Sequence, residues 1–103
     1  MIDSLQKAIN SIIHVAEPDR IILFGSRSRG EQTLESDYDL LVLKKNVAKP
    51  RVLSQQIYLH FKNIGAPIDI IVADLDNYEK LKEDPYLIYN AAAKGGIVIY
   101  EKQ

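Results

Sequence analysis

Three short apolar runs in the chain read as β-strands, and each carries its chemically distinctive residues at one end only. The runs cover residues 21–24, 37–43 and 67–73. A glycine and a serine follow the first run, whereas aspartates stand near the beginnings of the second and third. These polar ends meet only if the first strand runs antiparallel to the other two, which makes the second and third strands parallel. A parallel pair requires a crossover of a dozen or more residues, usually a helix.

Residues 50–64 supply a segment suited to that crossover. Their apolar side chains recur mainly at helical spacings, Pro50 suits a first turn and Gly65 suits a helix end. The sequence therefore predicts an α/β (α+β) fold, in which helices flank a small mixed β-sheet.

Three more helices are predicted outside the crossover. The first follows an Asp3-Ser4 cap and places its apolar residues on one face up to Ala16. A short helix is expected over residues 74–82, and another from an Asp84 cap with Pro85 in its first turn, ending at a Lys-Gly-Gly sequence.

Gly25 and Ser26 stand where the first strand gives way to a predicted helix. A helix N-terminus offers unpaired N–H groups to an anion, and glycine lets the backbone approach a phosphate closely. Arg27 and Arg29 add positive charge beside this turn. Such a turn is also a common structural junction, so its interpretation depends on the segment that follows.

That next segment holds Asp37 and Asp39 at the start of the second strand. Side chains on a strand alternate between its faces, so the two carboxylates point the same way, about 6.5 Å apart along the strand. Together they can bind one or two divalent cations. The alternative is that Asp37 ends a loop and Asp39 is a solvated edge residue. Aspartate is depleted in strands, which favours the metal-binding interpretation.

Asp69 lies in the third strand, which is otherwise apolar. A buried carboxylate without a partner is costly, so Asp69 either pairs with an arginine in the core or joins Asp37 and Asp39 around a metal. The absence of a basic residue from its own strand favours the second arrangement.

These residues resemble the GSx10DxD signature of the polymerase-beta-type nucleotidyltransferase superfamily, in its minimal (MNT) branch. Gly25 and Ser26 supply the GS, Asp37 and Asp39 supply the DxD, and Asp69 matches the third carboxylate. The resemblance covers nearly the whole chain and implies transfer of a nucleotide from a substrate such as ATP.

The resemblance also implies the roles of the site residues. Asp37, Asp39 and Asp69 are expected to hold two Mg²⁺ ions, and Asp69 to accept the proton of the attacking hydroxyl. Ser26 and the adjacent N–H groups are expected to bind the β- and γ-phosphates. Arg27 or Arg29 then offsets charge on the departing pyrophosphate.

Members of the minimal branch often pair with a separately encoded helical HEPN protein as a toxin–antitoxin system. The resemblance and the short chain, which leaves little sequence for an acceptor-binding domain, favour an antitoxin that transfers AMP to a toxin tyrosine. Two alternatives stay open: transfer to a small molecule or RNA with the help of a partner subunit, and a module that neutralises its partner by binding alone.

Composition limits the remaining possibilities. The 103 residues are 47% hydrophobic, enough for one modest core, so we expect a single domain over residues 1–103. A net charge of −1 provides no broad basic surface for nucleic acid. Without cysteine there is no disulfide or thiolate chemistry, and the compartment cannot be read from it. The N-terminus does not resemble a secretory signal and no apolar run is long enough for a membrane span, so we expect a cytoplasmic protein. The two histidines, His14 and His60, have no third ligand at metal-binding spacing and are interpreted as surface or core-edge residues.

Overall fold

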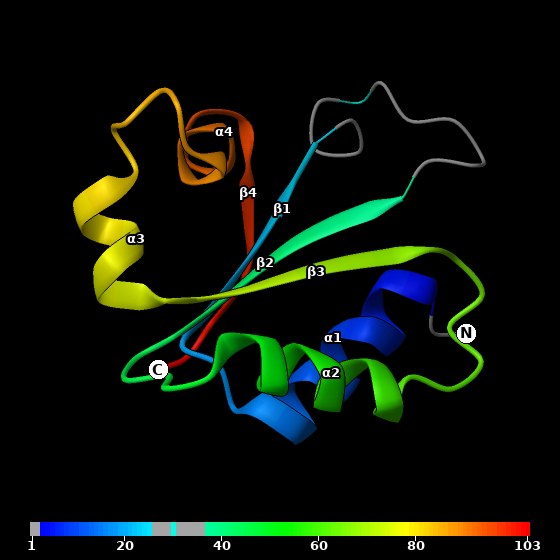
Figure 1. The fold of residues 1–103 in the computed structure, drawn as a ribbon. Coiled ribbons are helices and arrows are strands. Elements are labelled where there is room, and N and C mark those ends of the chain that lie inside the picture. Colours follow the sequence, from blue (N-terminus) through cyan, green and yellow to red (C-terminus); the bar gives the residue numbers. More distant parts are fainter. Residues whose placement is uncertain (1–2, 26–29, 31–36) are drawn as a thin grey trace.

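The computed structural model describes residues 3–25, 30 and 37–103, and Figure 1 shows a sheet with helices on both sides. The elements follow one another as α1 (Ser4–Ala16), β1 (Arg20–Phe24), β2 (Tyr38–Lys44), α2 (Pro50–His60), β3 (Ile68–Asp74), α3 (Leu75–Leu81), α4 (Ile88–Gly95) and β4 (Ile97–Glu101). In the described part of the chain, no helix is long and apolar enough to cross a membrane.

The four strands lie in the order β3-β2-β1-β4. β1 is antiparallel to β2 and to β4, and β2 is parallel to β3. The predicted mixed sheet and its strand directions are therefore confirmed. α2 makes the crossover between the two parallel strands, as the pattern in residues 50–64 predicts.

Each face of the sheet packs against one pair of helices (Figure 1). Leu40 and Val42 of β2 point into a core shared with α1 and α2. Leu41 and Leu43 point the other way, into a second core with Tyr78 of α3 and a residue of α4. Because β2 is buried on both faces, its sequence is a continuous apolar run after its acidic start.

The capped start of α1 is confirmed. The Asp3 side chain accepts a hydrogen bond of 2.8 Å from the backbone N–H of Gln6, which satisfies one of the free donors at the helix N-terminus. The apolar face of α1 is buried through Ala8, Ile9 and Ile12. This face attaches the helix to the sheet and to α2.

Two predicted helix boundaries are wrong. α2 ends at His60, because Phe61 is already extended, and Gly65 takes its positive φ of 86° in the loop beyond the helix. α4 begins only at Ile88. The Asp84 side chain accepts from the N–H of Tyr86, two residues on, and so forms a local turn in place of a helix cap.

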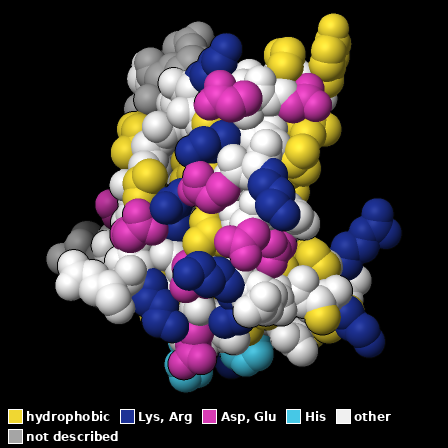
Figure 2. All heavy atoms as spheres, turned by 90° about the vertical axis from the view of Figure 1, so that its left-hand side faces the viewer, with side chains coloured by type: hydrophobic (Ala, Val, Ile, Leu, Met, Phe, Trp, Pro, Cys, Tyr) yellow, Lys and Arg dark blue, Asp and Glu magenta, His cyan; other side chains and the backbone are white. Residues whose placement is uncertain are grey.

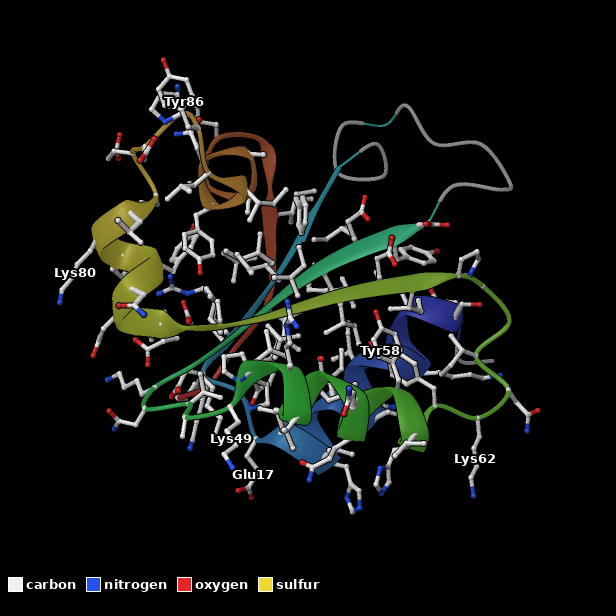
Figure 3. All side chains as sticks on the ribbon, in the orientation of Figure 1. Glu17, Lys49, Tyr58, Lys62, Lys80 and Tyr86 are labelled. Carbon is white, nitrogen blue, oxygen red and sulfur yellow. The ribbon has the colours of Figure 1, made fainter. Side chains whose placement is uncertain are left out.

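The outer strand β3 has one of its backbone groups covered by a side chain. The N–H of Ile70 donates a hydrogen bond of 2.7 Å to the hydroxyl of Tyr58, which reaches it from α2. Tyr58 is labelled in Figure 3, where it lies between α2 and the strand. Its ring also contacts Phe61 edge to face, which fixes the side chain in place.

Candidate active site

The pairing of β2 with β3 brings two predicted acids together. Asp39 and Asp69 are direct partners across the parallel pair, and Asp37 immediately precedes β2. Facing residues on adjacent strands project from the same side of the sheet, so both carboxylates share one face. The crossover made by α2 is what places these two segments, distant in the sequence, side by side.

The face that carries the acids is the one that α3 and α4 cover farther along the strands. On β2, Asp39 and Leu41 point to the same face of the sheet, and so do Asp69 and Ala73 on β3. Leu41 and Ala73 are both buried in the core with α3 and α4. The acids, however, stand where β2 and β3 begin, at the end of the sheet away from those two helices (Figure 1). Asp37 and Asp69 are exposed and Asp39 is half-buried, so the carboxylates can be reached by a ligand.

Gly25, from the first part of the sequence signature, lies beside Asp39, from the second part. Phe24 at the end of β1 pairs with Asp39, so the following residue lies against the Asp39 side chain. Gly25 has a φ of 77°, and a Cβ at this position would overlap Asp39 Oδ2. Glycine suits this position because of its left-handed backbone, and a Cβ here would push the end of the Asp39 side chain aside. Ser26, Arg27 and Arg29 lie outside the described residues.

Two of the acids, Asp39 and Asp69, have pKa values above the ordinary range of aspartate. Burial raises the pKa of Asp39, with further contributions from the negative charges of Asp69 and Asp37. The pKa of Asp69 is also raised, first by desolvation, then by a hydrogen bond with Asp37 and by its charge. The negative charges of neighbouring carboxylates repel one another, so the cluster gains from a bound cation.

Asp69 is exposed, contrary to the expectation that it lies buried in an apolar strand. β3 is an outer strand, and Asp69 stands near its start, whereas Ala73 near its end is buried in the core with α3 and α4. An arginine partner in the core is consequently not needed. Its exposure leaves Asp69 available to a ligand or an acceptor group.

The donor set suits Mg²⁺, because all of its atoms are carboxylate oxygens. Within residues 3–25, 30 and 37–103, no three His, Cys, Asp or Glu side chains stand close enough to hold a metal ion unaided. Asp37, Asp39 and Asp69 alone would therefore leave a Mg²⁺ ion to complete its shell with water and substrate phosphates, as is usual for this ion.

Solved structures of known proteins share this fold. The chain is 20% identical to a toxin–antitoxin crystallised with AMP-PNP, with a TM-score of 0.59. The match covers 99% of this chain and 76% of that one. A putative nucleotidyltransferase from Sulfolobus solfataricus is 20% identical, with a TM-score of 0.55 over 93% of this chain and 88% of that one. A mutant of the toxin–antitoxin MntA-HpeT is 17% identical, with a TM-score of 0.58 and coverage of 99% and 76%. No curated protein matches the chain.

At these identities the likeness establishes the fold, a mixed sheet of the nucleotidyltransferase type. The chain belongs to the polymerase beta nucleotidyltransferase family, because the model of that family matches residues 6–103. It is therefore a nucleotidyltransferase, with the glycine turn and the acids of β2 and β3 at its candidate active site.

Proposed function

We propose that this protein transfers AMP from ATP, with Mg²⁺, to a hydroxyl of a partner protein, and that it acts in this way as the antitoxin of a toxin–antitoxin pair. The observation that supports the transfer site best is the direct pairing of Asp39 with Asp69, with Asp37 beside them. Family membership makes nucleotidyl transfer the reaction class that these acids would serve.

The structural neighbours support the choice of substrate and partner. One is a toxin–antitoxin bound to AMP-PNP, an ATP analogue. Another, MntA-HpeT, is a mutant in which two aspartates, two positions apart, are changed to glutamate. Asp37 and Asp39 have that same spacing here. A helical HEPN toxin as the partner, and a tyrosine as the acceptor, rest on the sequence resemblance.

Each acid has a role that follows from its place. Asp37, Asp39 and Asp69 would hold the Mg²⁺ ions, which supply positive charge to the triphosphate and to the attacking hydroxyl. The exposed Asp69, at the outer strand, is reachable by an acceptor side chain and would take up the proton of its hydroxyl. Gly25 keeps the space beside Asp39 free for phosphate oxygens.

An exposed apolar segment offers a surface for a protein partner. Tyr86 is 94% exposed, and Leu87 and Ile88 beside it are also exposed. Figure 3 shows Tyr86 pointing outward from the connection between α3 and α4. In Figure 2 hydrophobic side chains gather at the upper right of the face that carries α3. Patches of this kind are typical of interaction sites.

The decisive experiment supplies α-labelled ATP and Mg²⁺ to extract of the source cell, with the wild-type protein or Asp39→Asn. We expect a labelled protein band with the wild type and none with Asp39→Asn, since the substitution removes a metal-binding charge from the centre of the cluster. Asp76→Asn, an exposed acid of α3 outside the site, is the matched control and should label the band like the wild type.

The other outcomes separate the alternatives. Label in RNA or in small solutes would contradict a protein acceptor and favour transfer with the help of a partner subunit. If Asp39→Asn neutralised the toxin as well as the wild type does, without any label, docking alone would be the function and the proposed transfer would be wrong.

A further inference from the structure

The two histidines of the chain meet on the surface, although they are far apart in the sequence. His14 in the last turn of α1 and His60 at the end of α2 line one depression of about 320 Å³, together with Val15 and Gln56. Both histidines are exposed. Figure 2 shows the two cyan side chains close to each other at the lower end of the face drawn.

A hydrogen bond fixes which nitrogen of His60 is available. His60 Nδ1 lies 2.8 Å from the backbone carbonyl oxygen of Gln56. A carbonyl oxygen can only accept, so Nδ1 carries the proton and Nε2 presents its lone pair. Histidines that bind metals almost always donate their other ring N–H to a carbonyl or carboxylate in this way. Nε2 is thus the nitrogen of His60 that faces a metal ion.

Both histidines lie on helices that are packed into the hydrophobic core. α1 and α2 share one hydrophobic core, through residues such as Ile12 and Ile57, both fully buried. The backbone positions of the two histidines are therefore fixed relative to each other, and the hydrogen bond to Gln56 also holds the His60 ring. Two ligands on neighbouring rigid helices lose little entropy when they bind the same ion.

We propose that His14 and His60 form a surface site for a divalent transition-metal ion of the Zn²⁺ class, held by two imidazole nitrogens. No third His, Cys, Asp or Glu completes a ligand group in the described parts of the chain, so water fills the remaining positions. Imidazole ligands select ions such as Zn²⁺, Ni²⁺ and Cu²⁺ over Mg²⁺, which prefers oxygen. The site is therefore chemically distinct from the carboxylate cluster.

The bound ion would act as a clamp between α1 and α2. Because α2 connects the two strands that carry the acids, a link across the helices stabilises the arrangement on which the active site depends. The ion binds the folded protein, where the histidines meet, more strongly than the unfolded chain. Its addition therefore raises the melting temperature.

The test uses the full chain without a histidine tag, in excess Mg²⁺ to occupy the carboxylates. The chain has only two histidines and no cysteine, so imidazole-dependent binding has only these two residues as its source. Zn²⁺ titration calorimetry should give one site in the wild type. His14→Gln and His60→Gln should each weaken it roughly tenfold or more, since each removes one of two ligands. Gln55→Ala, an exposed change on α2, should bind like the wild type.

Cu²⁺ electron paramagnetic resonance supplies a second readout that does not depend on stability. The wild-type spectrum should show coupling to two imidazole nitrogens, and each single variant should show one. Equal Zn²⁺ affinity in the wild type and the single variants would overturn the proposal. Coupling to one nitrogen in the wild type would do the same. Because neither readout involves nucleotide transfer, failure here leaves the proposed enzymatic function untouched.

Discussion

Gly25 contributes both to the backbone turn after β1 and to the geometry of the candidate active site. Its φ of 77° lies in the left-handed region that glycine enters without cost, and the missing Cβ leaves room for the Asp39 carboxylate. Gly30 has a similar φ of 73°, but a Cβ there would meet no atom of the described residues within 4 Å. Alanine substitutions at the two glycines therefore separate the free-energy cost of the left-handed backbone from that of the contact with Asp39.

We predict that Gly25→Ala abolishes nucleotide transfer and lowers the free energy of unfolding by more than Gly30→Ala does. Gly30→Ala should cost about 1 to 2 kcal/mol, the penalty of an L-residue in the left-handed region. Gly25→Ala adds displacement of the Asp39 carboxylate by the new methyl group. Urea denaturation and the labelling assay measure the two effects, and equal losses in both variants would rule out the contact as the cause.

The sequence predicts the acids of the site because their types and spacing are unusual for strands. It missed the exposure of Asp69, because an apolar strand can be buried on both faces or lie at the edge of a sheet, and its own sequence does not distinguish them. It also separated His14 from His60, whose meeting depends on how α1 packs against α2. Packing between helices leaves no local signal in either helix.

Among the elements, the junction of β3 with α3 depends most on one side chain. Asp74 Oδ2 accepts from the N–H of Asn77 and caps α3, while Oδ1 accepts from the N–H of Asn46 in the turn after β2. One carboxylate thus ties the end of β3, the start of α3 and the neighbouring turn together. The predicted helix over residues 74–82 is confirmed, with this residue as its cap.

We predict that Asp74→Ala lowers the free energy of unfolding by about 2 kcal/mol, since it removes a helix cap and a second hydrogen bond. Asp76→Ala is the control, because Asp76 is an exposed acid in the first turn of the same helix and contributes only a few tenths of a kcal/mol through the helix dipole. Urea unfolding compares the two. A similar small loss in both would show that Asp74 is not essential to the junction.

The helix boundaries that were wrong share a physical cause. Helix ends are decided by weak local competitors, such as the turn that Asp84 makes with Tyr86, and several residues can serve equally well. Strand directions were predicted correctly because they follow from a stronger requirement, the convergence of the acids and the glycine turn at one end of the sheet.

For the molecule as a whole, the acid cluster sets a pH dependence of stability. Asp39 and Asp69 have raised pKa values in the folded protein, so they bind protons more tightly there than in the unfolded chain. Their contribution to stability therefore falls as pH rises from the ordinary aspartate range through their folded pKa values. Their mutual repulsion is therefore felt more strongly as the pH rises.

We predict that Asp69→Asn raises the free energy of unfolding at pH 7, without metal, by up to about 1 kcal/mol, and that this gain disappears near pH 3. The pKa of Glu79 is lowered by its hydrogen bonds with Lys82 and Arg20, which gives the opposite trend, but this is common to both proteins and cancels in their difference. Urea unfolding at both pH values is the measurement. A difference that does not change with pH would contradict charge repulsion as its origin.

The hydrogen bond from Ile70 to Tyr58 has a consequence for the behaviour of the protein at high concentration. An outer strand with open amides invites a strand from another molecule to extend the sheet, which is the first step toward aggregation. The Tyr58 hydroxyl occupies one such amide in the middle of β3, so an incoming strand would meet an interrupted ladder. A single phenol thus helps keep separate copies of the protein from joining sheet to sheet.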